Sequence, residues 1–238
     1  MLKPAEIERA LVVVAHPDDV DFGAAGTVAT LTDAGAVVTY CLVTDGDAGG
    51  FDPDIPRGEL VSRRRAEQTR AANEVGVESL VFLGHADGRV VYYLALRRDI
   101  SRVIRQVRPT VVITQSPTRN LASMYASHPD HLATGESTVA AVYPDGRNPF
   151  ADPELLAEGL EAWSVSEMWV MTGGKQTDCI DVTSQVERKM RALMCHETQH
   201  PDPVRTDAMV REWMSSVATT FGVGDGRYAE SFEVVDTR

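Results

Sequence analysis

Apolar residues along the chain form short runs that alternate with longer segments of helical spacing. The short runs predict strands at 11–15, 37–43, 80–83, 110–114 and 167–171. The longer segments predict helices at 23–34, 59–75, 94–107 and 131–142. Strands that alternate with helices are typical of βαβ units around a parallel sheet. We therefore predict an α/β fold with a mostly parallel sheet, formed by residues 1–238 as a single domain.

Two clusters of histidine and aspartate follow predicted strands. His16-Pro17-Asp18-Asp19 comes directly after the first strand, and His128-Pro129-Asp130-His131 comes after the fourth. Active sites of parallel sheets lie at the carboxyl ends of the strands. We therefore expect the two clusters to meet in one site, although they are more than a hundred residues apart in the chain.

The residue types in these clusters suit a catalytic metal. A catalytic zinc ion takes three protein ligands from imidazole and carboxylate groups and keeps one position open for water. Each cluster alone supplies too few ligands, whereas His16, Asp19 and His131 together supply a complete set. We expect these residues to bind one divalent ion, zinc or another, since a mixed nitrogen and oxygen site accepts several.

The remaining residues of the clusters suit hydrolysis. Asp18 is expected to act as the general base, and His128 to stabilise the oxyanion or to protonate the leaving nitrogen. Asp130 is expected to orient His128 and to favour its protonated form. Asp18, Asp19 and Asp130 are also common helix N-cap residues. The presence of both clusters after strands favours the metal site over the capping role.

The motifs carry a resemblance to a known family. Residues 15–27, followed at long range by 128–131, resemble the PIG-L (LmbE-like) family of zinc-dependent N-deacetylases. Weaker matches, at 44–46, 64–67, 83–84, 87–88 and 192–199, extend the resemblance over most of the chain. Many members carry Glu where this chain has Val20, and this departure bears on tuning of the site and on substrate choice.

The resemblance implies both a fold and an activity. The fold would be a Rossmann-like three-layer sandwich. The activity would be hydrolysis of the amide of an N-acylated amino sugar or a small conjugate, releasing acetate and a free amine. In the family the residues matching His16, Asp19 and His131 hold the metal, and those matching Asp18 and His128 act as the base and its electrophilic partner. The residue matching Arg64 would line the substrate site, although pairing of Arg64 with Glu67 is equally compatible with the helical spacing.

Two other segments bear on function. Residues 44–50 are expected to form a flexible substrate loop that places Asp45 near the metal. The pattern His196-Glu197-Thr198-Gln199-His200 matches that of zinc peptidases, in which two histidines share one helix face and Glu is the base. Pro201 disfavours helical geometry at His200, so the peptidase remains the less favoured alternative. A metal-binding or metabolite-sensing module without turnover is a further alternative, which the presence of Asp18 and His128 disfavours.

Composition limits the classes of binding partner and the cellular compartment that we expect. The net charge of −12 argues against nucleic acid and against an anionic membrane. Three widely spaced cysteines and the lack of a basic-then-apolar amino-terminal segment indicate a reducing, cytoplasmic location. The proline-rich stretch 143–165 is expected to be irregular and to form a lid or a contact in a homo-oligomer.

Overall fold

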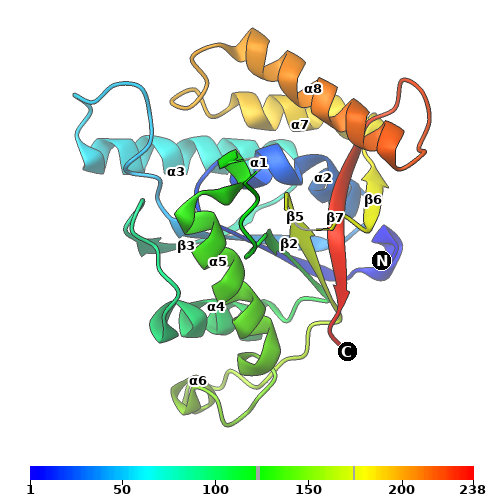
Figure 1. Ribbon diagram of the computed structural model, residues 1–238. Helices are drawn as coiled ribbons and strands as arrows, with labels where there is room; N and C mark the ends of the chain where they lie inside the picture. Colours follow the sequence, from blue (N-terminus) through cyan, green and yellow to red (C-terminus); the bar gives the residue numbers. More distant parts are fainter. Residues whose placement is uncertain (122–123, 174) are drawn as a thin grey trace.

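A seven-stranded sheet forms the centre of the computed structural model, which describes residues 1–121, 124–173 and 175–238 (Figure 1). The order of the strands across the sheet is β3-β2-β1-β4-β5-β7-β6. The first five strands in this order are parallel, and β7 is antiparallel to both of its neighbours. The bounds are β1 (Arg9–Val14), β2 (Val37–Thr44), β3 (Ser79–His85), β4 (Val111–Gln115), β5 (Glu167–Met171), β6 (Asp178–Asp181) and β7 (Ala229–Asp236).

Helices cover both faces of the sheet and complete a three-layer fold. In the view of Figure 1 the upper layer contains α1 (Asp19–Gly23), α2 (Ala25–Asp33), α3 (Arg57–Glu74), α7 (Val186–Met194) and α8 (Pro203–Thr220). The lower layer contains α4 (Leu94–Val107), α5 (Pro129–Ala140) and α6 (Pro153–Ala157). Short helical turns complete the chain at η1 (Pro4–Glu6), η2 (Met124–Ser127), η3 (Ala141–Asp145) and η4 (Thr183–Gln185).

The central strands are apolar on both faces because helices cover both. In β1, Val12 and Val14 belong to the apolar core shared with α2 and α3, whereas Leu11 and Val13 belong to the core shared with α4. All four side chains are fully buried. The continuous apolar run that predicted this strand is therefore the pattern expected of a parallel strand between two helical layers.

The order of the strands places a crevice between β1 and β4. The chain runs outward from β1 through β2 to β3 and then returns to the other side of β1 as β4. Loops that leave neighbouring strands in opposite directions open a crevice at their carboxyl ends, where ligands bind in sheets of this kind. His16 follows β1 and His131 lies on α5, the helix that follows β4, so both clusters reach this crevice.

The α/β class and the mostly parallel sheet expected from the sequence are confirmed. Each of the predicted strands is present within two residues of its expected ends, and α4 has the expected bounds. The helix expected at 23–34 begins earlier and is interrupted at Ala24, which lies between α1 and α2. The apolar pattern of the sequence does not predict β6 and β7. Glu230, Glu233 and Asp236 interrupt the apolar pattern of β7, which pairs antiparallel with β5 and β6.

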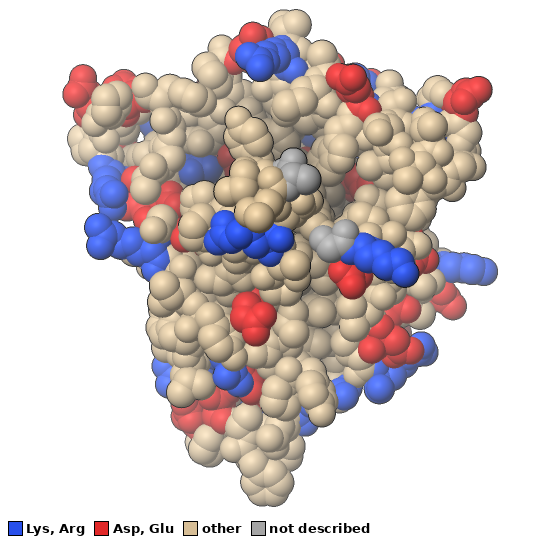
Figure 2. Space-filling view, viewed as in Figure 1, with Lys and Arg blue, Asp and Glu red and all other residues tan. Residues whose placement is uncertain are grey.

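The surface gives no sign of a broad basic region on the face seen in Figure 2. Lys and Arg side chains stand there in separate groups, with acidic and uncharged residues between them. This distribution agrees with the net charge of −12.

None of the helices in the part of the chain that the structure describes has the length and apolar character needed to cross a bilayer.

A glycine on α5 permits the close approach of this helix to β4. A Cβ atom at Gly135 would collide with the backbone oxygen of Gln115 and would lie 2.9 Å from the nitrogen of Pro117. Gly58 on α3 has no heavy atom within 4 Å of the same position. Because the obstacle at Gly135 is backbone, it yields only if the helix moves.

We therefore expect Gly135→Ala to lower the free energy of unfolding by about 1–3 kcal/mol, the usual cost of overpacking. Gly58→Ala is the matched control and should raise it by roughly 0.5–1 kcal/mol, because alanine favours the helix. Urea unfolding followed by circular dichroism measures both. Equal effects of the two substitutions would contradict the tight packing of α5 on β4.

Candidate active site

Two neighbouring strands fix the position of His16. The backbone N–H of Ala15 donates to Oε1 of Gln115 at the end of β4, over 2.9 Å. The hydroxyl of Thr44 at the end of β2 donates to the carbonyl oxygen of Ala15, also over 2.9 Å. The loop after β1 is thus held from both sides, and His16 projects from it into the crevice.

The imidazole of His16 has acidic neighbours at both ring nitrogens. Nε2 lies 3.0 Å from Oδ1 of Asp87 and 3.2 Å from Oδ2 of Asp130, while Nδ1 lies 3.4 Å from Oδ2 of Asp19. Nδ1 also lies 3.2 Å from Nε2 of His131. Burial opposes the charged form, but the hydrogen bonds to Asp130, Asp19 and Asp87 raise the pKa of His16 to about 12. The surrounding carboxylates therefore favour the protonated form of the imidazole.

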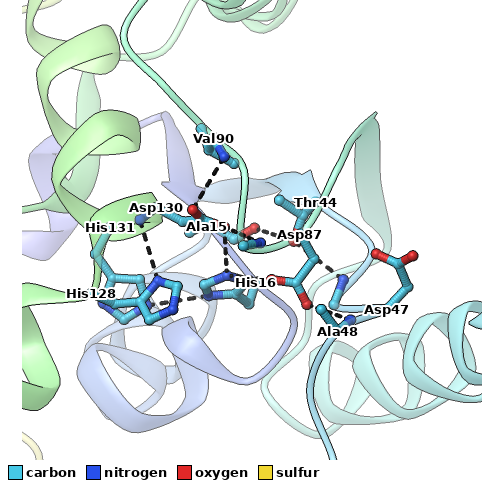
Figure 3. Close-up of polar contacts among 12 residues, drawn as sticks. Ala15, His16, Thr44, Asp47, Ala48, Asp87, Val90, His128, Asp130 and His131 are labelled. Atoms are coloured by element: carbon cyan, nitrogen blue, oxygen red, sulfur yellow. Dashed lines mark hydrogen bonds and ion pairs between the residues drawn. The ribbon is translucent and has the colours of Figure 1, made fainter.

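The expected ligands His16, Asp19 and His131 are in mutual contact. Nε2 of His131 lies 3.1 Å from Oδ1 of Asp19, in addition to its contact with His16. Figure 3 shows the rings of His128 and His131 on one side of His16 and Asp87 on the other. Two imidazole nitrogens and one carboxylate oxygen that converge in this way match the donors of a three-ligand metal site. The residues present therefore fit a divalent cation at this point.

A second group of potential ligands, His16, Asp87 and Asp130, lies on the other side of the imidazole. Its carboxylates are already engaged. Asp87 accepts the N–H of Ala48 over 2.8 Å, and Asp130 accepts the N–H groups of Gly88 and Val90 over 2.7 and 3.2 Å. A carboxylate on the far nitrogen of a ligating histidine fixes its ring and its tautomer. We therefore assign this group to the orientation of His16 rather than to a second cation.

Asp18 lies beside these ligands in an unusual backbone conformation. Its φ is +88°, in the left-handed region. Nη2 of Arg64 donates to Oδ2 of Asp18 over 3.2 Å and to the carbonyl oxygen of Pro17 over 2.7 Å. Burial raises the pKa of Asp18 to about 6, against the opposing effect of the Arg64 charge. At neutral pH the carboxyl is thus ionised and is a stronger base than an ordinary aspartate.

The prediction that the Asp130 carboxylate orients His128 was wrong, because the backbone N–H of Asp130 makes this contact. His128 is the N-cap residue of α5, and its Nδ1 accepts the backbone N–H of Asp130 over 3.2 Å. The Asp130 side chain turns instead to His16 (Figure 3). Burial, together with the neighbouring His16 and His131, lowers the pKa of His128, so its protonated form is disfavoured. The neutral ring carries its proton on Nε2, because Nδ1 is the acceptor of the cap.

Arg64 and Asp45 have partners within the protein. Arg64 is 3% exposed, and its Nη1 donates to the carbonyl oxygen of Gly46 over 2.9 Å. The guanidinium therefore supports the loop that carries Asp18. Asp45 accepts two hydrogen bonds from Arg65, at 2.7 and 3.0 Å. The expected contacts of Arg64 and Asp45 with substrate stay predictions.

The peptidase pattern does not form a peptidase site. Helix α7 ends at Met194, so His196 and His200 do not share a helix face. Nε2 of His196 lies 2.8 Å from Oδ2 of Asp21, and both residues are fully buried. The Glu197 side chain lies at the surface, 3.5 Å from Arg70.

The alternative pairing of Arg64 with Glu67 does not occur. Glu67 instead accepts the N–H and the hydroxyl of Thr198.

Two residues that the sequence motifs do not single out also contribute to the site. Asp87 follows β3, and the signal that would have found it is an acidic residue after a strand at the same edge of the sheet. Its hydrogen bond to His16 lowers the pKa of the Asp87 carboxyl to about 2, although burial opposes this shift. Gln68 on α3 accepts the backbone N–H of Asp18 over 2.9 Å. A glutamine among the many polar residues of α3 gives no comparable signal.

The state of His16 leads to a prediction about metal binding. Because a metal ligand must be deprotonated, binding at pH 7 should release about one proton per ion. The apparent association constant should then rise about tenfold per pH unit below the pKa of His16. Calorimetric titration with Zn²⁺ in two buffers of different ionisation enthalpy measures the released protons.

Asp45→Asn is the control for this experiment, because Asp45 pairs with Arg65 and should not change the number of protons released. Binding without proton release in the unmodified protein would mean that His16 is neutral before the cation binds. That result would contradict the raised pKa of His16.

Comparisons with known proteins agree with this geometry. The sequence profile of the PIG-L family, described as GlcNAc-PI de-N-acetylase, matches residues 11–142. Diacetylchitobiose deacetylase of Thermococcus kodakarensis is 32% identical over 231 residues, which cover 97% of this chain and 84% of the relative. A probable N-acetyl-alpha-D-glucosaminyl L-malate deacetylase 2 of Bacillus anthracis is 30% identical over 217 residues, with 88% of each chain covered.

A solved structure extends the similarity to three dimensions. N,N'-diacetylchitobiose deacetylase from Pyrococcus horikoshii, in complex with its inhibitor MPG, superposes with a TM-score of 0.87 at 28% identity. The match covers 98% of this chain and 85% of that one. The relatives are named deacetylases, which are hydrolases of amide carbon–nitrogen bonds. This chain belongs to the PIG-L family.

Proposed function

We propose that this protein is a divalent-metal-dependent N-deacetylase that hydrolyses the acetamido group of an N-acetylated amino sugar or a small conjugate of one. The observation that carries the proposal is the convergence of His16 Nδ1, His131 Nε2 and Asp19 Oδ1, whose charges act on the neighbouring carboxylate of Asp18. The relatives that cover most of this chain are named for substrates of this class. The geometry of the site and the names of the relatives therefore support the same chemistry independently.

Zinc is the cation that we propose for the site. Two imidazoles and one carboxylate form a donor set typical of catalytic zinc. When bound, the ion would acidify a water molecule and polarise the acyl oxygen of the substrate. Asp87 and Asp130 would hold the His16 ring in place through its other nitrogen.

We assign the proton transfers to Asp18 and the stabilisation of the oxyanion to His128. The Asp18 carboxylate takes a proton from water as the water oxygen adds to the acyl carbon. The Nε2–H of His128 donates a hydrogen bond to the oxyanion of the tetrahedral adduct. When the carbon–nitrogen bond breaks, its electron pair stays on nitrogen, which takes the proton held by Asp18. The products are acetate and the free amine.

The raised pKa of Asp18 fits this assignment. A general base works best when its pKa is near the working pH, since it is then ionised and still basic. Burial of Asp18 brings its pKa to about 6. A module that only binds metal has no need of such a group, which favours catalysis over the sensing alternative.

We further propose that the protein works in the cytoplasm and self-associates through residues 143–165. Cys41, Cys179 and Cys195 are free thiols, which suits a reducing compartment. Tyr143 and Phe150 are 64% and 88% exposed. Figure 1 places α6 beyond the end of α5 that is remote from His128, which favours a subunit contact over a lid.

The first test separates the roles of two residues. Asp18→Ala should keep the metal and lose activity by roughly 10²–10⁴-fold, the usual contribution of a general base. His131→Ala should lose both metal and activity, because it removes one of three ligands. Elemental analysis and the rate of amine release measure the two properties. Normal metal content and normal turnover in His131→Ala would remove the metal from the proposed mechanism.

The second test identifies the substrate class. The zinc-loaded protein should release acetate from at least one member of a panel containing N,N'-diacetylchitobiose, N-acetylglucosamine and N-acetylglucosaminyl malate. Asp18→Ala at the same metal content is the control for contaminating activity. Retention of metal with no acetate released from the panel would favour the silent metal-binding module.

A further inference from the structure

The conformation of Asp18 needs support from its surroundings. A residue other than glycine at φ +88° is strained, by of the order of 1–3 kcal/mol, and persists only where neighbouring groups hold it. The Asp18 side chain makes no capping hydrogen bond to α1, although Asp18 is its N-cap residue. Its backbone N–H instead donates to Oε1 of Gln68 over 2.9 Å. This bond connects the proposed base to the long helix α3.

The amide of Gln68 is held in one orientation. Its Oε1 must face Asp18, because a backbone N–H needs an acceptor, and its Nε2 donates to Oδ2 of Asp21 over 2.9 Å. A flipped amide would set a donor against the N–H of Asp18 and an oxygen against the carboxylate of Asp21. Gln68 and Asp21 are both fully buried, so water cannot replace either bond.

His196 fixes the far end of this arrangement. Nε2 of His196 lies 2.8 Å from Oδ2 of Asp21, the same oxygen that accepts from Gln68. His196 is fully buried just beyond the carboxyl end of α7. A continuous chain of hydrogen bonds therefore runs from His196 through Asp21 and Gln68 to the backbone of Asp18. Its members come from segments far apart in the sequence.

We propose that Gln68, Asp21 and His196 are positioning residues that hold Asp18 in its left-handed conformation and so aim its carboxylate at the reacting water. The inference rests on the proposed function for the role of Asp18, but the geometric part stands without it. It also gives the histidine of the peptidase pattern a place in the site without making it a metal ligand.

Three variants test the chain of hydrogen bonds. Gln68→Leu removes both polar groups at nearly constant volume. Gln68→Glu keeps the acceptor for Asp18 but sets a carboxylate against Asp21. The double variant Gln68→Glu/Asp21→Asn restores a donor opposite the new carboxylate, since the asparagine amide can turn its nitrogen toward Glu. The same nitrogen then also donates to Nε2 of His196, which accepts as the Nδ1–H tautomer. Thr69→Ala, on the exposed side of the same helix, is the matched control.

Each single change at Gln68 should lower kcat roughly 10- to 100-fold, the range expected when a reacting group is misplaced by about 1 Å. KM and zinc content should stay within about twofold of the unmodified protein, because Gln68 is buried and is not a ligand. The double variant should recover most of the loss, and Thr69→Ala should match the unmodified protein. A purely structural role for Gln68 would lower kcat only together with zinc content and the free energy of unfolding, not kcat alone.

Crystal structures provide a readout that needs no substrate. In Gln68→Leu, φ of Asp18 should leave the positive region, whereas in the double variant it should stay near the value in the unmodified protein. An Asp18 that keeps its conformation in Gln68→Leu overturns the inference, as does unchanged kcat in the same variant. Failure of the proposed function is a separate result, because it would be seen as inactivity of the unmodified zinc-loaded protein on the substrate panel.

Discussion

The site depends on one imidazole that is held between acidic side chains. His16 meets Asp87 and Asp130 at one ring nitrogen and Asp19 at the other. The carboxylates on the first side fix the plane of the ring, and the second side remains directed at His131 and Asp19. A proton on the His16 ring offsets part of this negative charge, which is why the pKa of His16 is raised. A divalent cation that takes the place of the proton balances it better, so the same arrangement explains both the raised pKa of His16 and the suitability of the site for a metal.

Such a site is costly for the fold and is supported by its surroundings. Buried carboxylates lose solvation, which must be offset by hydrogen bonds or opposite charge. Asp130 receives backbone N–H groups from Gly88 and Val90, and Asp87 receives that of Ala48. Asp18 has no comparable set of donors to its carboxylate and keeps a raised pKa. The residue left least compensated is the one to which we assign the proton transfer, as expected where stability is given up for function.

The sequence predicted the fold where the pattern was continuous and the site where the motif was local. Apolar runs between helical layers predicted the parallel strands. The two clusters predicted the convergence of His16, Asp19 and His131, because consecutive polar residues after a buried strand are conspicuous. Strands β6 and β7 were not predicted because charged residues interrupt their apolar pattern. The partner of Asp130 was wrong because side-chain direction depends on the turn that begins α5. Gln68 and His196 lie far from Asp18 in the chain, and only the packing of α3 and α7 brings them together.

The measurement that tests the central claim most directly is an anomalous difference map from crystals of the protein soaked in Zn²⁺. The account predicts one strong peak at about 2.0–2.1 Å from His16 Nδ1 and from His131 Nε2, with a carboxylate oxygen of Asp19 completing the set. A peak on the Nε2 side of His16, between Asp87 and Asp130, would contradict it, as would the lack of any peak within reach of His16.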